Sequence, residues 1–364
     1  MISISLCMIV KNEEKQLQKC LDSVCDIVDE IIIVDTGSTD RTKEIAGHYT
    51  AKIYDFPWID DFAAARNYSF DRATKQFIMW LDADDLLLPP DRGKLKQLKR
   101  TLNPNQEVVM MDYHLALDDA GVPLILTRRY RLVRRDKKFK WKGIVHEDID
   151  VSRASIAYSD VAVTHCRQGV HTERNLKILE SCIASGGGLE GRLLLHYGSE
   201  LADLKRYEEA IVQLNYFLKQ PSQHMDDYIL ACIKLADCYG QLGLVDKKLE
   251  ALLRSFQYDL PQSEICCAIG GCFEGRGQWA AAIYWYLQAL HNASSPAVME
   301  NRTLRTWIPH SRLCICYAQR GDLNNAYHHN EKALEYLPQE QGLLENRLKL
   351  QRALGLPLSN DDPL

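Results

Sequence analysis

The first 85 residues alternate between short apolar runs and segments with helical spacing of their apolar positions. Four segments are short and largely apolar, as in strands buried on both faces: residues 3–10, 31–34, about 52–55 and 77–81. Three intervening segments show helical periodicity: residues 13–25, about 40–48 and about 61–73. Strands that alternate with helices in this way predict an α/β domain with a parallel, doubly wound sheet.

Between residues 106 and 170 the pattern changes to extended stretches with few long helices. The predicted strands here are residues 108–111, 128–133 and 156–157. We interpret this region as the second half of the same domain. A Gly-rich break at 186–188 then precedes uninterrupted helical pattern, so we predict an α/β domain over 1–185 and an all-α domain over 190–355.

The C-terminal half repeats itself. Small or apolar anchors recur at spacings of 38, 34 and 44 residues: Gly198, Ala236, Gly270 and Cys314. A leucine or aromatic residue lies three positions after each anchor, and a glycine lies seven positions after the last three: Gly243, Gly277 and Gly321. Small residues where two helices touch, with a turn glycine between the helices, form a pattern that resembles the tetratricopeptide repeat. The period of that repeat is about 34 residues. We predict about four repeats, with an ordinary helical bundle as the alternative.

Composition narrows the class of protein. The formal net charge of −5 gives no electrostatic reason to expect nucleic-acid binding. The opening apolar run has only ten residues and lacks the flanks of a signal peptide, and no window suits a membrane span. We therefore expect a cytoplasmic protein with no transmembrane segment, whose twelve scattered cysteines are free, buried thiols.

Carboxylates follow the third strong strand directly. Asp82 and Asp84 lie two residues apart at the predicted carboxyl end of strand 77–81, where open α/β sheets bind ligands. Together they can face a divalent cation that bridges a diphosphate, and their hard oxygens suit Mg²⁺ or Mn²⁺. The alternative is a solvated acidic turn that caps the next helix.

Further candidates follow the other strands. Asp35 ends the second strand and can accept an imide N–H from a pyrimidine base, while Gly37 and Ser38 let the backbone approach a ligand closely. Asp40 is better explained as a helix cap. The end of the first strand, through Asn12, is predicted to lie beside the same crevice.

Arg66 and Asn67 fall on the helix before the acidic strand end. Arg66 can offset diphosphate charge. Its alternative is a surface ion pair with Asp61 or Asp71.

These motifs together resemble a known family. The segments SLCMIVKNEE, VDTGSTD, AAARN and WLDADD, in this order, are similar to the GT-A-fold glycosyltransferases of family 2. With the repeats, the chain resembles the subgroup fused to tetratricopeptide repeats, which includes bacterial peptide S-glycosyltransferases of the sublancin type. The motifs span about residues 3–170, and they are more specific for fold and reaction than for substrate.

The resemblance implies metal-dependent, inverting transfer from a nucleotide-sugar, with the following roles by carry-over. The metal ligands are Asp82, Asp84 and His165. Donor contacts come from Val10, Asn12, Glu13, Asp35, Gly37, Ser38, Arg66, Asn67, Asp82 and Ala83. Glu147 is the expected catalytic base and its neighbour Asp148 the alternative, while His146 is a ligand, a substrate contact or a packed histidine.

The expected co-substrate is a UDP-sugar rather than a GDP-sugar, with Mn²⁺ or Mg²⁺. The expected acceptor is a Cys, Ser or Thr side chain of a peptide or protein recruited by the repeats, which could also form a homodimer. Alternatives are a saccharide acceptor or a catalytically weak repeat scaffold. A nucleotidyltransferase is disfavoured because the segment after the first strand, beginning at Lys11, contains no glycine.

Overall fold

The computed structural model describes residues 1–166, 173–221, 225–291 and 299–357. The chain divides into two compact units, Met1–His196 and Tyr197–Leu364. The division falls shortly after the predicted Gly-rich break. Among the described residues, the helices are too short or too polar to span a bilayer.

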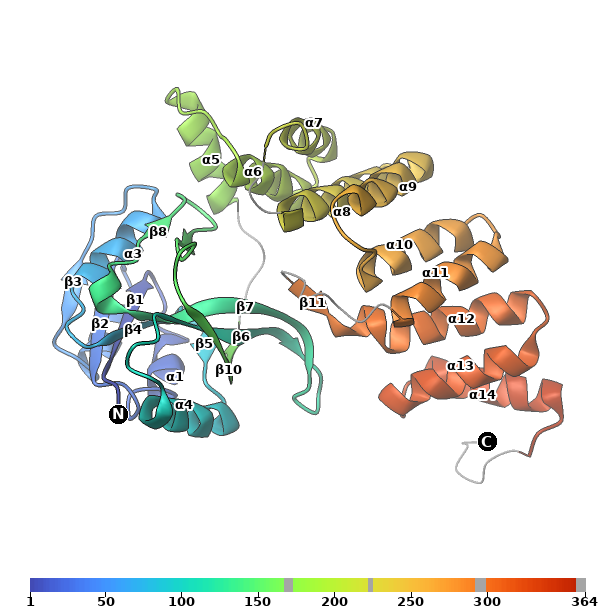
Figure 1. Cartoon of the computed structure of the whole chain (residues 1–364), viewed down its shortest axis with the longest axis horizontal. Helices are drawn as coiled ribbons and strands as arrows, with labels where there is room; N and C mark the ends of the chain where they lie inside the picture. Colours follow the sequence, from blue (N-terminus) through green and yellow to red (C-terminus); the bar gives the residue numbers. More distant parts are fainter. Residues whose placement is uncertain (167–172, 222–224, 292–298, 358–364) are drawn as a thin grey trace. The chain divides into compact units, whose positions relative to one another are not determined.

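The N-terminal unit is built on a mixed sheet (Figure 1). Its first four strands are parallel: β1 (Ile4–Val10), β2 (Glu30–Asp35), β3 (Ile53–Asp55) and β4 (Phe77–Trp80). Four more strands extend it: β5 (Asp85–Leu86), β6 (Val108–Leu117), β7 (Pro123–Arg134) and β10 (Ile156–His165). The order along the sheet is β3-β2-β1-β4-β7-β6-β10-β5.

The predicted parallel arrangement is confirmed for the first four strands, and β6 and β10 are also parallel to each other, but two other strands run antiparallel to their neighbours. β7 runs antiparallel to both β4 and β6, and β5 runs antiparallel to β10. The reason is the short connection between β6 and β7, where Asp118 accepts backbone N–H groups from Ala120 and Val122. Such a tight turn can join only antiparallel strands.

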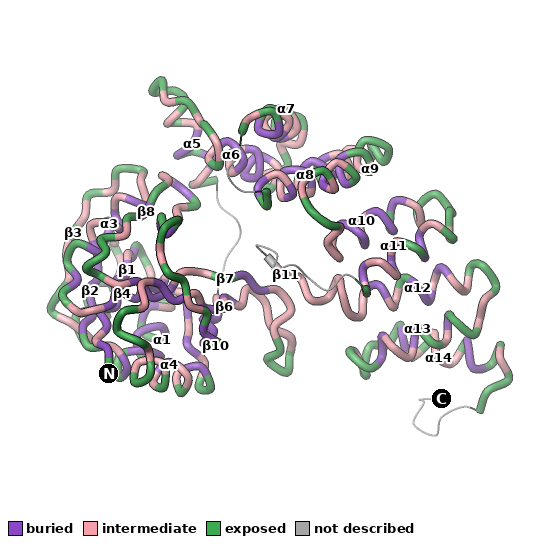
Figure 2. The backbone as a smooth tube through the Cα atoms, in the orientation of Figure 1, coloured by how far each residue is buried: buried purple, intermediate pink, exposed green. Residues whose placement is uncertain are grey.

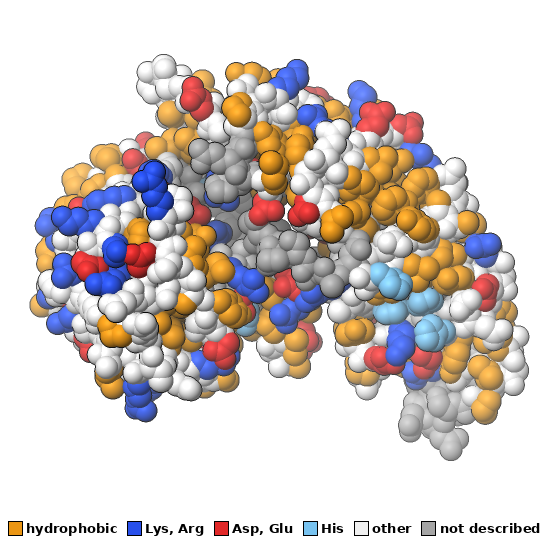
Figure 3. All heavy atoms as spheres, viewed as in Figure 1, with side chains coloured by type: hydrophobic (Ala, Val, Ile, Leu, Met, Phe, Trp, Pro, Cys, Tyr) orange, Lys and Arg blue, Asp and Glu red, His pale blue; other side chains and the backbone are white. Residues whose placement is uncertain are grey.

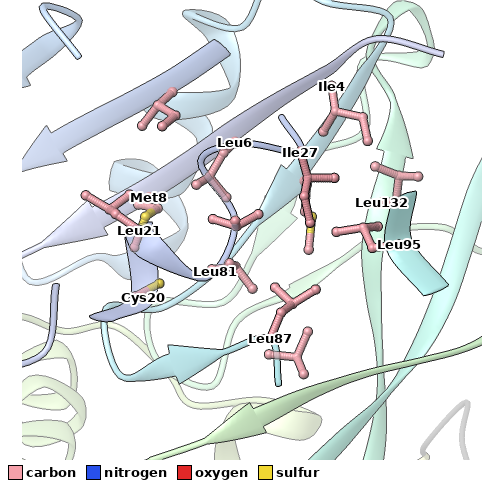
Figure 4. Close-up of a cluster of buried hydrophobic side chains, with 14 of the residues drawn as sticks. Ile4, Leu6, Met8, Cys20, Leu21, Ile27, Leu81, Leu87, Leu95 and Leu132 are labelled. Atoms are coloured by element: carbon pink, nitrogen blue, oxygen red, sulfur yellow. The ribbon is translucent and has the colours of Figure 1, made fainter. Parts of the chain in front are cut away.

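Helices cover both faces of the sheet (Figure 1): α1 (Leu17–Asp22), α2 (Thr42–Gly47), α3 (Phe62–Asp71) and α4 (Pro89–Thr101). The main core lies between the sheet and the α1 and α4 helices, as Figure 4 shows for Ile4, Leu6, Leu21, Leu81 and Leu95. A second cluster joins α3 to the other face through Phe70, Cys7 and Ile32. The strand ends between these layers are thereby fixed in position.

Two smaller elements complete this unit. The hairpin of β8 (Trp141–Lys142) and β9 (Asp148–Ile149) packs beside α3, where Trp141 meets Phe70 edge-on with ring centroids 5.8 Å apart. The helix α5 (Arg174–Ala184) follows β10 along the chain. The hairpin carries both predicted catalytic acids close to the carboxyl end of β4.

The C-terminal unit is mostly helical, and its first helix, α6 (Arg192–Asp203), begins before the division after His196. The elements that follow are α7 (Tyr207–Phe217), α8 (Met225–Gln241), α9 (Val245–Arg254), α10 (Ser263–Glu274), α11 (Trp279–His291), β11 (Met299–Asn301), α12 (Trp307–Gln319), α13 (Leu323–Tyr336) and α14 (Gln341–Leu354). The four predicted anchors fall on α6, α8, α10 and α12, the first helix of each pair. The three turn glycines have φ of 72°, 68° and 76°, a backbone that disfavours other residues. The repeat register is confirmed.

Small anchors are required because the paired helices approach closely. A Cβ on Gly198 would lie 2.8 Å from Leu214, and one on Gly270 would lie 2.9 Å from Tyr286. Gly271 is different, since a Cβ there would meet only the Tyr286 hydroxyl, at 3.7 Å. Adjacent glycines therefore face different steric demands.

We expect Gly270→Ala to destabilise the protein and Gly271→Ala to leave stability unchanged or raised. Overpacking against the buried Tyr286 ring should cost about 1–3 kcal/mol, whereas alanine in an open helical position gains about 0.5–1 kcal/mol over glycine. Urea denaturation of the two variants measures the difference. If Gly270→Ala and Gly271→Ala were equally stable, α10 and α11 would be able to move apart at this contact at little cost.

The aromatic side chains of the repeats are partly core and partly surface. Phe217 and Tyr286 are buried, but Tyr216 and Tyr284 are 54% and 56% exposed. Figure 2 shows that the helices of this unit carry buried, intermediate and exposed positions. Hydrophobic side chains also gather over α8 and α9 in Figure 3. All twelve cysteines are free and most are buried, as predicted, although Cys25 is exposed.

Candidate functional site

The candidate site lies where β1, β2 and β4 end. Val10 is paired with Asp35 in the parallel ladder, so the loops that follow these strands start side by side. The turn beginning at Asp82 follows β4 on the other side of β1. The sheet thus brings the three predicted motifs to one edge, as expected for ligand sites of open α/β sheets.

Side chains tie the first two loops together. The Asn12 backbone N–H donates to Ser38 Oγ at 2.9 Å, and Asn12 Oδ1 accepts from the Thr39 backbone at 2.8 Å. Asn12 adopts φ of 56°, an uncommon backbone for a residue with a side chain. In the same way Asp40 accepts the Thr42 N–H at 3.0 Å, close to its predicted capping role. Asn12 and Ser38 therefore shape the loops that they were predicted to line.

Asp35 is buried at the centre of this edge. Its Oδ1 accepts the backbone N–H groups of Gly37 and Ser38, at 3.0 and 2.9 Å, and Gly37 has φ of 102°. Its Oδ2 is buried and accepts no hydrogen bond from any residue that the structure describes. A buried carboxylate oxygen without a donor is energetically costly. This oxygen fits the predicted contact with a base N–H.

Glu13 faces the acidic turn. Burial, followed by the charges of Asp84 and Asp82, raises its pKa to about 7. Its backbone N–H is held by Thr42 Oγ1 at 2.7 Å. A concentration of negative charge at this edge is the electrostatic environment that a bound cation stabilises.

A candidate metal site is formed by residues that follow Asp82 in the chain together with His165 of β10. Ligand atoms of Asp84, Asp85 and His165 lie within 4.8 Å of one another. The pKa of Asp84 is raised, first by burial, and that of His165 is raised, first by its hydrogen bond to Asp85 and then by the charge of Asp84. Two carboxylates and an imidazole suit Mn²⁺ or Mg²⁺. The predicted Asp84 and His165 lie together here, whereas the carboxylate of Asp82 turns to Arg66.

Asp85 is held by a buried network. Arg131, which is fully buried, pairs with Asp85 at 2.9 Å and lies between the rings of Trp80 and Tyr113, 3.8 and 4.5 Å from their centroids. The Tyr113 hydroxyl donates to Asp85 at 2.8 Å and lies 2.8 Å from His165 Nδ1. Burial alone would raise the pKa of Asp85, but the charge of Arg131 lowers it overall. The network orients the acid and the imidazole together.

We expect Arg131→Met to destabilise the protein by about 3–5 kcal/mol, because it leaves the Asp85 charge buried without its partner. The double variant Arg131→Met with Asp85→Asn should recover part of this loss. Arg128→Met is the matched control, since Arg128 is the exposed partner of Asp112, a pair worth at most about 1 kcal/mol. Urea denaturation measures the free energy of unfolding of all three variants. If Arg131→Met and Arg128→Met lost equal stability, the Arg131–Asp85 pair would not be the buried ion pair described here.

Arg66 joins the two sides of the site. Its Nη2 donates to Asp82 Oδ1 at 2.8 Å and its Nε donates to Glu147 Oε1 at 2.6 Å. Burial alone would lower its pKa, but Asp82 and then Glu147 raise it overall. The alternative of a surface ion pair with Asp61 or Asp71 is wrong, because Arg66 is buried against aromatic rings.

The two predicted catalytic acids differ in their surroundings. Glu147 is mostly buried, and Arg66 holds one of its oxygens. Asp148 is more exposed; its Oδ1 accepts the Ile149 N–H at 2.8 Å and its Oδ2 lies 3.6 Å from Arg192. Both oxygens of Asp148 are thus engaged, while Glu147 is anchored through one.

Two predicted residues have structural contacts. The amide of Asn67 both donates to and accepts from the backbone of Trp141, at 3.0 and 2.9 Å. His146 stacks on His196 with ring centroids 4.3 Å apart and lies outside the candidate metal site. Burial, then His146, lowers the pKa of His196 well below its usual range. The contact with His196 favours a structural role for His146, although His146 itself is exposed.

Comparison with known proteins agrees with this geometry. The family model of glycosyl transferase family 2 matches residues 5–154, which include every strand of the parallel half of the sheet. Residues 5–154 are a family 2 glycosyl transferase domain. The match to the family 2 domain ends just after the β8–β9 hairpin.

Relatives of the chain are similar over part of their length. Glycosyltransferase SunS, derived from the SPbeta prophage of Bacillus subtilis, is 31% identical over 64% of this chain and 58% of its own. A TPR repeat-containing protein of Synechococcus elongatus is 38% identical over 42% of this chain and 36% of its own. The chain thus spans about half the length or less of these relatives.

Among solved structures, glucosyl-3-phosphoglycerate synthase from Mycobacterium tuberculosis superposes with a TM-score of 0.38 at 16% identity, over 52% of this chain and 81% of that one.

Sequence analysis of the family 2 domain missed three residues: Tyr113, Arg131 and Asp85. In the sequence, Asp85 is one of three aspartates in the segment WLDADD, and nothing there sets it apart from the other two. The sequence offers little signal for Arg131, because the strand that carries it holds four arginines, Arg128, Arg129, Arg131 and Arg134, and only the structure shows that Arg131 is fully buried. Which of the three aspartates pairs with Arg131 depends on tertiary structure.

Proposed function

We propose that the protein transfers a sugar, with inversion, from a nucleotide-sugar to a side chain of a peptide or protein. The observation that carries this proposal is the juxtaposition at one sheet edge of the buried Asp35, the Asp84–Asp85–His165 group and the anchored Glu147. These groups would supply a contact to the base, a cation site and a proton acceptor.

The donor side would use the loops after β1 and β2. Asp35 Oδ2 would accept the N3–H of uracil in a UDP-sugar. Guanine offers N–H donors as well, so donors with both bases have to be compared. A Mn²⁺ or Mg²⁺ ion held by Asp84 and His165 would neutralise the charge of the diphosphate as it leaves, and Asp85, whose oxygens are engaged by Arg131 and Tyr113, would keep the imidazole in position. Asp82, oriented by Arg66, would contact the ribose of the donor.

The acceptor side would use Glu147. Arg66 fixes one carboxylate oxygen, so the other can accept a proton from the acceptor as the new bond forms. One direct displacement needs no covalent sugar–enzyme intermediate, which agrees with a single acid in this role. Asp148 is the less suitable base because both of its oxygens are engaged.

The acceptor is proposed to be a peptide because a repeat unit follows the family 2 domain. Helical repeats commonly bind extended peptides or partner proteins. A thiol or a hydroxyl could both be deprotonated by a carboxylate base. A saccharide acceptor remains the competing candidate, and a homodimer through the repeats remains a prediction.

The test is release of nucleotide from a panel of UDP- and GDP-sugars with Mn²⁺ or Mg²⁺, with and without Cys- and Ser-containing peptides or oligosaccharides. We expect Mn²⁺-dependent UDP release that peptides increase, with the sugar found on the peptide by mass spectrometry. If oligosaccharides but not peptides increased UDP release, the acceptor would be a saccharide rather than a peptide. Binding of neither metal nor any sugar nucleotide would refute a transferase function.

A further inference from the structure

Trp141 is a buried tryptophan that opens the hairpin carrying Glu147. Its side chain is 4% exposed, and its Nε1 N–H is buried and donates to no residue that the structure describes. Its backbone is held on α3, because the amide of Asn67 donates to the Trp141 carbonyl and accepts the Trp141 N–H. The indole ring is therefore fixed by the backbone and by packing, and its side chain acts through its faces and edges.

The ring of Trp141 packs on the guanidinium of Arg66. The Cζ atom of Arg66 lies 4.8 Å from the ring centroid of Trp141 and 4.9 Å from that of Trp80, and the two indole rings are 4.8 Å apart and nearly perpendicular, at 82°. Attraction between a cation and an aromatic ring is strongest where the cation is removed from water, as the buried Arg66 is. The two indole rings thus hold this guanidinium.

The position of Arg66 determines the position of the expected catalytic base. Its Nε donates to Glu147 at 2.6 Å, while its Nη2 donates to Asp82 at 2.8 Å. An arginine side chain has several rotatable bonds, so it can fix an acid in one orientation only if the guanidinium is itself fixed. Trp141 belongs to the same hairpin as Glu147, so it joins this hairpin to Arg66 a second time.

We propose that Trp141 is a positioning residue for sugar transfer, whose ring keeps Arg66 in the orientation that presents Glu147 to the acceptor. Trp141 is buried and acts through Arg66 rather than on a substrate. A displacement of about 1 Å at a reacting group can lower a rate by about 100-fold. This inference rests on the proposed function, because the role of Glu147 as base defines what is positioned.

The test compares full-length wild type with Trp141→Leu, Trp141→Phe and Phe70→Leu. Leucine removes the aromatic face from Arg66, whereas phenylalanine keeps an aromatic face and removes no side-chain hydrogen bond. Phe70 provides the matched control for lost packing, since it is buried in the same cluster and meets the Trp141 ring edge-on. Trp80 is a poorer choice, because its ring also packs on Arg131.

Transfer is measured over a range of peptide concentrations at saturating donor and Mn²⁺, with UDP-glucose and a Cys-containing peptide or with the pair from the panel above that wild type uses best. Trp141→Leu should lower kcat by about 10- to 100-fold and leave the KM for the peptide unchanged. Trp141→Phe should recover most of kcat. Phe70→Leu should keep the wild-type kcat even if its melting temperature falls, because it leaves the contact with Arg66 in place.

A double variant shows whether Trp141 acts through Arg66. In an Arg66→Met background, Trp141→Leu should lower kcat no further, because the guanidinium that it holds is already absent. A further fall of about 10-fold would overturn the proposal, as would equal losses of kcat in Trp141→Leu and Phe70→Leu or in Trp141→Leu and Trp141→Phe. If wild type and Trp141→Leu transfer sugar at the same rate, the positioning role is refuted while the proposed function stands. A wild type that transfers no sugar with the whole panel refutes both.

Discussion

Asp84→Ala is expected to lower Mn²⁺-dependent sugar transfer by at least about 10²–10³-fold, the usual effect of removing a group that stabilises leaving-group charge. Asp84 belongs to the candidate metal site. Because its side chain is only partly buried, the substitution should leave the fold intact. Transfer is measured as UDP release over a Mn²⁺ titration. Direct Mn²⁺ binding, by electron paramagnetic resonance, should weaken in parallel.

Asp119→Ala serves as the control for loss of a carboxylate, because Asp119 is exposed at the turn between β6 and β7. It should transfer sugar at the wild-type rate. If Asp84→Ala kept both Mn²⁺ affinity and turnover, the Asp84–Asp85–His165 group would not be the cation site. Asp82 and Glu13 would then be the acids to test next.

Glu147→Gln is expected to leave donor binding unchanged and to reduce transfer by about 10²–10⁴-fold, the usual contribution of a general base. The amide oxygen of glutamine can still accept the hydrogen bond from Arg66, so the substitution preserves this contact while removing proton acceptance. Donor affinity by calorimetry and single-turnover transfer to the peptide separate the two effects.

Asp148→Asn is the matched comparison, because it makes the same chemical change one residue further on. It should retain most transfer, since both oxygens of Asp148 are engaged in other contacts. If Asp148→Asn lost most of its transfer activity while Glu147→Gln kept normal turnover, Asp148 rather than Glu147 would be the catalytic base.

The sequence predicted the elements whose signal is local. The strands β1, β2, β3 and β4 fall at the predicted positions because continuous apolar runs define them. The helix predicted over 13–25 is shorter, Leu17–Asp22, since hydrogen-bonded turns replace its ends. Strand direction was predicted for the parallel half alone. The antiparallel course of β7 depends on the turn at Asp118, which apolar periodicity does not report.

The candidate site was predictable where side chains follow strand ends directly. Asp35 and Asp84 could be found in this way, and His165 through the family resemblance. Asp85 and Arg131 could not be assigned, because residues 46 positions apart meet only in the folded sheet. Arg131 could not be distinguished from Arg128 by sequence either, since only the structure shows that Arg131 is buried and Arg128 exposed.

Arg66 has a consequence for interpreting kinetic data. One guanidinium holds Asp82 on the donor side and Glu147 on the acceptor side, so a change of charge at either acid is felt by the other. Groups that share a partner have non-additive free energies. Rate losses from substitutions at the two acids therefore have to be combined in a thermodynamic cycle that includes Arg66, rather than multiplied as independent factors.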